Sequence, residues 1–364
     1  IHHNRLHRIA ADGGRCSRAA CIGDADSQTR RNGGDRHRLR IAIEYPGEIA
    51  QDHRRGGGGD RERFIDITGQ RGVRIRAAQR GCRGVSPDVL AKCYEESKAF
   101  FALPEAEKCR IHIKNSPNHR GYGPLLEENT NPDSQGDLHE AFDLAGDIPA
   151  SDPDVLAGKT LYGPNLWPER PPGFKPAALD CYRSLVALGH TLFRAFALAL
   201  ELEEDYFLPL IRKPCAHMRI LRYPPQEVVV SEKQIGIGAH SDYECFTILN
   251  QNGDSALQVL NAAGVWVEAP PIPDTFVINV GDMMARWTND LFCSTLHRVI
   301  NRSGKERYSI PLFFGPDYDT VISPLPSCQD ADHPPLYPPI KAGDYILSRF
   351  DETYDYRQSQ PEKV

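Results

Sequence analysis

Residues 307–314 of this 364-residue chain read Arg-Tyr-Ser-Ile-Pro-Leu-Phe-Phe, a run of residues that favour β-strands. Similar short runs precede it and are separated by turn clusters such as Gly253-Asp254. They lie at 215–223, 245–250, 257–260, 265–269, 275–280 and 295–300. Short strands at intervals of roughly ten residues are typical of a sandwich or barrel. Because helical patterns do not alternate with these runs, a parallel α/β sheet is disfavoured.

Two helices are expected before these strands. Ser86-Pro87 is typical of a helix start, and apolar residues then recur at helical spacing until the helix ends near Pro104. A second helix is expected from about Pro176, with apolar residues three and four apart as far as Leu200. Residues 115–174 are rich in Pro, Gly, Asn and Asp and are expected to form a long loop region over a surface. The predicted fold is mainly β with helical support (α+β), a jelly-roll barrel or double-stranded β-helix.

The first 83 residues differ from the rest of the chain. They contain 18 Arg, no Lys, 7 Asp and 3 Glu, for a net charge of +8, whereas the remaining 281 residues carry −14. They hold 13 of the 30 glycines and two of the 31 aromatic residues, Tyr45 and Phe64. This segment therefore has little with which to build a hydrophobic core.

Three interpretations of residues 1–83 remain open. An Arg/Gly-rich arm that binds nucleic acid explains the charge, but such arms usually include Lys and stacking aromatics. A disordered extension explains the composition. We favour a third, that these residues are an out-of-frame or intronic translation of a GC-rich stretch. The predicted organisation is then an atypical segment at 1–83, a truncated helical and loop part at 84–205, and a jelly-roll domain with a C-terminal extension at 206–364.

Composition excludes several classes of protein. Hydrophobic content of 40%, charged content of 25% and a net charge of −6 are those of a globular protein. No apolar run reaches the roughly 18 residues that a membrane span needs. The ten cysteines are scattered without a Cys-x-x-Cys pair, so we expect reduced thiols in a cytoplasmic protein. The acidic balance after residue 83 argues against nucleic-acid binding by that part.

A metal site is predicted from three residues. In His240-Ser241-Asp242, residues i and i+2 of an extended strand point to the same side, so both side chains can reach one ion. His297, in a β-branched run 55 residues later, supplies a third ligand. Two His and one carboxylate on one face of an octahedron leave positions open, which suits non-haem Fe(II) and oxygen chemistry.

An anion site is predicted ten residues beyond His297. Arg307 and Ser309 share a strand face, and a guanidinium beside a hydroxyl is a good receptor for a carboxylate. Tyr223 could add a phenol donor to the same anion.

Other conspicuous residues have simpler interpretations. Four histidines lack ligand partners at useful spacing and are not expected to bind metal: His119, His139, His190 and His217. Trp266, Trp287 and Phe313-Phe314 are expected to pack in the barrel, and Gly281-Asp282 to form a turn.

The chain resembles the isopenicillin N synthase-like branch of the Fe(II)/2-oxoglutarate-dependent dioxygenases over about 84–350. The ordered motifs are Arg120-Gly-Tyr122, Glu140-Ala-Phe142, Gly163-Pro-Asn-Leu-Trp167, Met218-Arg-Ile-Leu-Arg-Tyr-Pro-Pro225, Gly238-Ala-His-Ser-Asp-Tyr243, Leu257-Gln-Val259, Phe276-Val-Ile-Asn-Val-Gly-Asp282, Trp287-Thr-Asn289, Ser294-Thr-Leu-His-Arg-Val299 and Arg307-Tyr-Ser309.

The resemblance implies a role for each predicted site residue. His240, Asp242 and His297 would bind Fe(II), and Arg307 and Ser309, assisted by Tyr223, would hold the distal carboxylate of 2-oxoglutarate. O2 would be the oxidant, and a small organic metabolite would be hydroxylated, desaturated or cyclised. We expect a monomer without nucleic-acid or membrane partners. Two alternatives stay open: an isopenicillin N synthase-type oxidase that does not use 2-oxoglutarate, and a catalytically silent product of a damaged reading frame.

The chain departs from the family pattern at a cosubstrate contact, at two positions that bear on specificity, and before residue 84. Leu221 replaces a frequent Asn, Glu244 replaces the usual Gly after the His-x-Asp-Tyr run, and Asp254-Ser-Ala256 replaces an acidic-Gly turn. Before Gly84-Val85 the family has an aromatic strand ending in Asn-His, whereas this chain has Gln79-Arg-Gly-Cys-Arg83. The abrupt end of the resemblance supports the out-of-frame interpretation.

Overall fold

The computed structural model describes residues 84–130, 136–226, 235–273 and 275–353, together with the backbone of three short upstream strands. These are β1 (Arg40–Glu44), β2 (Asp66–Thr68) and β3 (Arg74–Ala78), of which β1 and β3 pair with each other. The rest of the 1–83 segment lies outside the described residues, so the interpretations of it stay predictions. Among the described residues, no helix is long and apolar enough to cross a membrane.

Two sheets form the body of the fold. The larger has the strand order β2-β11-β8-β13-β6-β5-β4 and is antiparallel except where β2 pairs with β11. The smaller is antiparallel, with the order β10-β9-β12-β7. The strands of the larger sheet are β4 (Gly121–Gly123), β5 (Glu140–Ala145), β6 (Pro214–Tyr223), β8 (Phe246–Asn252), β11 (Val277–Val280) and β13 (Arg307–Asp317). Those of the smaller are β7 (Ile237–His240), β9 (Leu257–Leu260), β10 (Trp266–Glu268) and β12 (His297–Val299). A further pair is β14 (Val321–Ile322) with β15 (Ile340–Lys341).

Each predicted β-rich run overlaps a strand, but the expected loop region at 115–174 is wrong in part. It contains β4 and β5, and every residue of β5 is buried. β5 pairs with β6 along its whole length, which explains how a segment flanked by loop composition becomes an inner strand. The 84–205 part of the chain therefore contributes strands to the same sheet as the 206–364 part.

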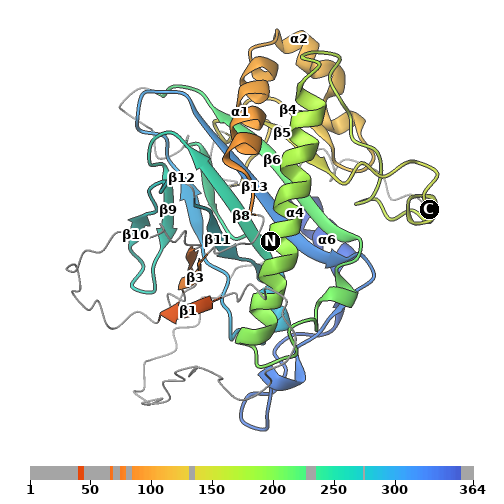
Figure 1. Cartoon of the computed structure of the whole chain (residues 1–364), viewed down its shortest axis with the longest axis vertical. Coiled ribbons are helices and arrows are strands. Elements are labelled where there is room, and N and C mark those ends of the chain that lie inside the picture. The colour runs from red at the N-terminus through yellow and green to blue at the C-terminus, as the bar shows by residue number, and fades with distance from the viewer. Residues whose placement is uncertain are drawn as a thin grey trace, which may run out of the picture. The chain divides into compact units, whose positions relative to one another are not determined.

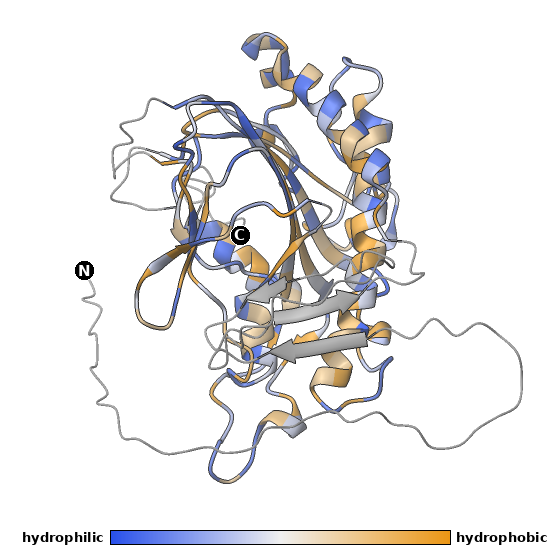
Figure 2. Cartoon of the chain, turned by 60° about the vertical axis from the view of Figure 1, so that its left-hand side comes forward, coloured by the Kyte–Doolittle hydropathy of each residue, from blue (hydrophilic) through white to orange (hydrophobic). Residues whose placement is uncertain are grey.

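The two long helices lie side by side against one face of the larger sheet, and each carries both hydrophobic and hydrophilic residues (Figures 1 and 2). Both predicted long helices are present as α1 (Pro87–Phe101), capped by Ser86, and α4 (Phe174–Ala199). α4 approaches the sheet closely at Gly189, where a Cβ atom would lie 2.3 Å from the ring of Phe314. The remaining α-helices are α2 (Glu105–Lys108), α3 (Pro153–Leu156), α5 (Asp282–Trp287) and α6 (Ala342–Thr353).

The expected turn at Gly281-Asp282 is instead the start of α5. The backbone N–H of Asp282 donates to the carbonyl of Asp242 at 2.8 Å, and the acidic side chain stands in the first helical turn, where a negative charge is favourable. This contact ties the start of α5 to the segment that follows β7.

Strands β6 and β13 place the functional side chains. Alternate residues along a strand face the same side. On β6 those that line one pocket are His217, Arg219, Leu221 and Tyr223, and on β13 they are Arg307, Ser309, Pro311 and Phe313. Two neighbouring strands thus supply one continuous wall.

Candidate active site

A pocket lies between the two sheets. One wall comes from the larger sheet, the other from β7, β9 and β12, and Phe350 of α6 closes part of it. Its volume is about 1080 Å³, including the open mouth. Pockets of this size hold small organic molecules.

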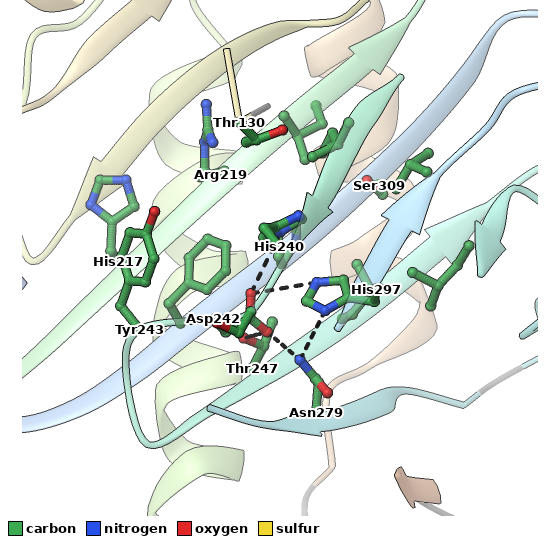
Figure 3. A pocket seen from close by; sticks show the side chains of 18 of the residues that line it. Thr130, His217, Arg219, His240, Asp242, Tyr243, Thr247, Asn279, His297 and Ser309 are labelled. Atoms are coloured by element: carbon green, nitrogen blue, oxygen red, sulfur yellow. Dashed lines mark hydrogen bonds and ion pairs between the residues drawn. The ribbon is translucent and has the colours of Figure 1, made fainter. Parts of the chain in front are cut away.

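The three residues predicted to bind metal converge in this pocket (Figure 3). His240 ends β7 and His297 begins β12, and the two residues are partners in the antiparallel pairing of these strands. Asp242 follows the end of β7 rather than lying on the strand, yet its Oδ1 lies 3.9 Å from Nε2 of His240 and 3.6 Å from Nε2 of His297. One ligand atom from each of the three residues lies within 4.8 Å of the others, which fits a single ion.

Neighbouring groups orient these three side chains. Nδ1 of His240 lies 2.8 Å from the carbonyl of Gly238, and Nδ1 of His297 lies 3.1 Å from the carbonyl of Thr295. A carbonyl only accepts, so Nδ1 of His240 carries the proton and its Nε2 is left as a lone-pair donor. Nδ1 of His297 also lies 3.4 Å from Asn279 Nδ2, but the shorter contact with the Thr295 carbonyl favours the same tautomer. Burial and the neighbouring His297 lower the pKa of His240 to about 4, which favours the neutral, ligating form.

Asp242 is held at its second oxygen. Its Oδ2 accepts hydrogen bonds from Thr247 Oγ1 at 2.7 Å and from Asn279 Nδ2 at 2.5 Å. Oδ1 is therefore the oxygen that faces the histidines.

The predicted anion site lies in the same pocket. Arg307 is 2% exposed, its Nη2 donates to Gln251 Oε1 at 3.0 Å, and its Cζ lies 4.8 Å from the centre of the Tyr223 ring. Tyr223 and Ser309 are linked by a 3.4 Å contact between their hydroxyl oxygens. Nε and Nη1 of Arg307 have no hydrogen-bond partner among the described residues. A buried guanidinium with two such nitrogens fits the carboxylate of a ligand.

Sequence reasoning missed the polar groups at the other end of the pocket. Those that line it are His119, Glu128, Thr130, Asp143, His217 and Arg219. The cluster of His240, Asp242 and His297 includes none of the four histidines that were given simpler interpretations. Two of these four, His119 and His217, line the pocket. Phe313 also lines the pocket, whereas Trp287 and Phe314 pack in the core as predicted. One signal could have found His217 and Arg219: both share a face of the predicted strand with Tyr223, because alternate residues of a strand face the same side.

Glu244, where the family usually has Gly, is buried in the pocket wall. Burial, together with the charge of Asp242, raises its pKa to about 8. At neutral pH this carboxyl is therefore largely protonated and adds little negative charge to the pocket.

Comparisons with known proteins agree with this geometry. The model of the 2OG-Fe(II) oxygenase superfamily matches residues 214–316, and that of the N-terminal region of the non-haem dioxygenase in morphine synthesis matches residues 82–170. The chain is 35% identical to the 2-oxoglutarate-Fe(II) type oxidoreductase hxnY of Emericella nidulans, over 83% of this chain and 85% of that protein. It is 36% identical to a homoarginine-6-hydroxylase of Arabidopsis thaliana, over 73% of this chain and 79% of the relative.

Solved structures confirm the predicted jelly-roll fold. Neurospora crassa T7H in complex with alpha-KG and thymine aligns with a TM-score of 0.65 and 29% identity over 74% of this chain and 85% of that one. A 2OG-Fe(II) oxygenase family protein from Caulobacter crescentus aligns with a TM-score of 0.66 and 32% identity over 74% and 87%.

The relatives, the family models and the cluster of two histidines and one aspartate lead to the same conclusion about chemistry. The cofactors of this enzyme are Fe(II) and 2-oxoglutarate, and it oxidises small metabolites. With Arg307, Ser309 and Tyr223 beside the cluster in one jelly-roll pocket, the chain belongs to the isopenicillin N synthase-like branch of the 2OG-Fe(II) oxygenase superfamily.

Proposed function

We propose that His240, Asp242 and His297 bind Fe(II), and that Arg307, Ser309 and Tyr223 hold the distal carboxylate of 2-oxoglutarate. The observation that carries this proposal is the buried Arg307 side chain, whose Nε and Nη1 have no partner among the described residues and which lines the same pocket as the cluster. Arg307 neutralises the far carboxylate of the cosubstrate, while Tyr223 and Ser309 fix its orientation. This favours a user of 2-oxoglutarate over an oxidase that does not need it.

The proposed reaction is hydroxylation of a C–H bond in a small metabolite. One oxygen atom of O2 enters the substrate and the other enters succinate, as 2-oxoglutarate loses CO2. Iron supplies the activation of O2, and the protein orients the C–H bond and excludes water. The names of the relatives support hydroxylation, because one is a homoarginine-6-hydroxylase.

An anaerobic titration tests the proposal. Fe(II) added to the protein with 2-oxoglutarate is expected to produce a visible charge-transfer band, and aerobic addition of a substrate is expected to release succinate. His240→Ala should abolish the band and the iron binding, whereas His333→Ala, which alters an exposed histidine, should leave both unchanged. Wild-type iron affinity in His240→Ala would refute the ligand assignment, and wild-type protein without a band would refute the function.

We also propose a monomer that resides in the cytoplasm. The cysteines in the described part of the chain are free thiols, which is typical of a reducing compartment. Light scattering of the purified protein tests the oligomeric state, and a fluorescent fusion tests the location.

For the domain organisation, we keep the division into a segment at 1–83 and two oxygenase parts at 84–205 and 206–364. The two oxygenase parts share one sheet, because β4 and β5 of the 84–205 part pair with each other and β5 pairs with β6 of the 206–364 part. Resequencing the 5′ end of the transcript tests whether 1–83 is in frame.

A further inference from the structure

Ring side chains line the end of the pocket away from the proposed 2-oxoglutarate site. They are His119, His217, Tyr243, Phe313 and Phe350. His119 stacks on Phe350 with ring centres 4.7 Å apart, and the rings of His217 and Tyr243 lie 6.4 and 6.5 Å from that of Phe350. Figure 3 shows His217 and Tyr243 on the opposite side of His240 from Ser309. Flat ring faces of this kind suit a planar ligand.

At this end of the pocket, the carboxylates of Glu128 and Asp143 are already paired with cations of the protein. Glu128 receives two hydrogen bonds from the guanidinium of Arg219, at 3.0 and 2.6 Å, and Nε of Arg219 lies 3.0 Å from Oδ1 of Asp143. Behind Glu128, both ring nitrogens of His139 face acceptors: the carbonyl of Gly236 at 2.8 Å and Glu128 Oε2 at 3.0 Å. Both nitrogens must then carry protons, so His139 is a cation. Among the described residues, Arg219 and His139 are thus paired with Glu128 and Asp143, and Arg120, a third cation, does not line the pocket.

The two pocket histidines add no charge. Nη1 of Arg120 lies 3.0 Å from Nδ1 of His217, and because a guanidinium only donates, Nδ1 accepts. The proton of His217 is on Nε2, which donates to Asp143 Oδ1 at 2.6 Å. Burial lowers the pKa of His217 and brings that of His119 well below its usual value. Arg120 itself donates to the backbone carbonyls of Asn118, His119 and Leu161.

At this end of the pocket, Asp143 has an oxygen atom that accepts no hydrogen bond from the described residues. Asp143 is fully buried and lines the pocket, and its Oδ2 has no hydrogen-bond partner among the described residues. Burial alone would raise the pKa of Asp143, but the charge of Arg219 and the hydrogen bond from His217 hold it below its usual value. Oδ2 is therefore an ionised acceptor, and only an N–H or O–H donor can satisfy it.

We propose that this end of the pocket binds an uncharged, planar nitrogen heterocycle whose ring N–H donates to Asp143. The proposal rests on the proposed function and specifies its substrate class. A carboxylate ligand would be disfavoured, because Arg219 is already paired with two carboxylates and the ionised Asp143 would repel it. An ammonium or guanidinium ligand would add a charge to a network whose two carboxylates are already paired with cations.

Four ligands of similar ring size separate these cases: 2-quinolone, 1-methyl-2-quinolone, 2-naphthoate and 2-naphthamidine. Calorimetric titration into the anaerobic protein with Fe(II) and 2-oxoglutarate is expected to show the tightest binding for 2-quinolone. Its affinity should exceed that of each of the other three by about tenfold or more, as a hydrogen bond to a buried carboxylate implies. Equal binding of the N-methyl compound, or tighter binding of the anion or the cation, would overturn the proposal.

A variant locates the contact. Asp143→Asn should weaken 2-quinolone binding about tenfold and remove the preference over the N-methyl compound, with 2-oxoglutarate affinity within about twofold of wild type as the sign of an intact fold. Asp180→Asn, at an exposed position of α4, is the matched control. If Asp143→Asn does not fold, the N–H against N-methyl comparison in the wild-type protein decides alone. A charge-transfer band without this selectivity refutes the heterocycle and leaves the proposed function standing, whereas no band refutes the proposed function.

Discussion

Arg219 and Arg307 lie on the neighbouring strands β6 and β13 and line the same pocket, but their guanidinium groups are bound differently. Arg219 is held by two carboxylates, Glu128 and Asp143. Among the described residues, Arg307 donates to Gln251 and its guanidinium faces the ring of Tyr223. A buried arginine is therefore an anion receptor only where carboxylates of the protein do not already pair with its charge. One end of the pocket therefore suits a dianionic cosubstrate and the other an uncharged substrate.

The largest expected effect is on stability and comes from removing Arg219, the arginine that is paired with two carboxylates. Arg219→Ala leaves Glu128 and Asp143 buried without their cation, so the free energy of unfolding should fall by about 3–5 kcal/mol. Urea denaturation of the iron-free protein measures this. Arg183→Ala, which removes an exposed partner of Asp180, should change stability by less than about 1 kcal/mol. A loss as small as that control in Arg219→Ala would show that its charge is not needed there.

Arg307, which is not paired with a carboxylate among the described residues, should affect the binding of 2-oxoglutarate rather than the stability of the fold. Arg307→Ala removes the two charge-assisted hydrogen bonds that we propose it donates to 2-oxoglutarate, and the KM for 2-oxoglutarate should rise about 100-fold. Steady-state succinate release at varied 2-oxoglutarate measures the change, with the exposed Arg302→Ala as the control. An unaltered KM in Arg307→Ala would remove the contrast between the two arginines.

A pH experiment tests the cation behind Glu128. Although burial opposes protonation, the hydrogen bond to Glu128 and its charge raise the pKa of His139 above the usual 6.5, with Asp137 adding to this and Arg219 opposing it. The stabilisation is fully present below pH 6.5 and is lost as pH rises through the raised pKa. Urea denaturation at a series of pH values should show this loss in the wild-type protein and a flatter profile in His139→Gln. Identical profiles would mean that His139 is neutral in the folded protein.

The smallest effect is expected at the ring wall. Phe350→Leu keeps an apolar side chain but removes the stacking on His119, so the affinity for 2-quinolone should fall two- to tenfold, as about 0.5–1.5 kcal/mol implies. Calorimetric titration of 2-quinolone into the variant measures this affinity. Phe207→Leu, a core substitution outside this pocket, should leave the affinity unchanged. A loss in both variants would show that the effect comes from general destabilisation.

Much of the proposed iron and cosubstrate site was predictable because the convergence of its side chains depends on short spacings. His240 and Asp242 are two residues apart, as are Arg307 and Ser309, and such pairs share a side wherever the backbone is extended. The strand predictions around His297 and Tyr223 then sufficed to bring the residues into one barrel.

The far end of the pocket was not predictable because it depends on pairing between distant segments. Asp143 meets Arg219 only because β5 lies beside β6 in a register that makes the two residues partners. β5 lies in a region of loop-like composition, and Glu128 comes from a segment without a strand or helix pattern. Local sequence holds no information on that register.

The shared wall of β6 and β13 also constrains how this enzyme can diversify. Since 307, 309, 311 and 313 face the pocket by alternation, inserting one residue near the start of β13 would turn the later positions away from it. A point substitution at Pro311 or Phe313 reshapes the substrate end and leaves Arg307 in place. New substrate preferences are therefore expected to arise by exchange of single side chains within these strands, and changes in length to be confined to the loops between them.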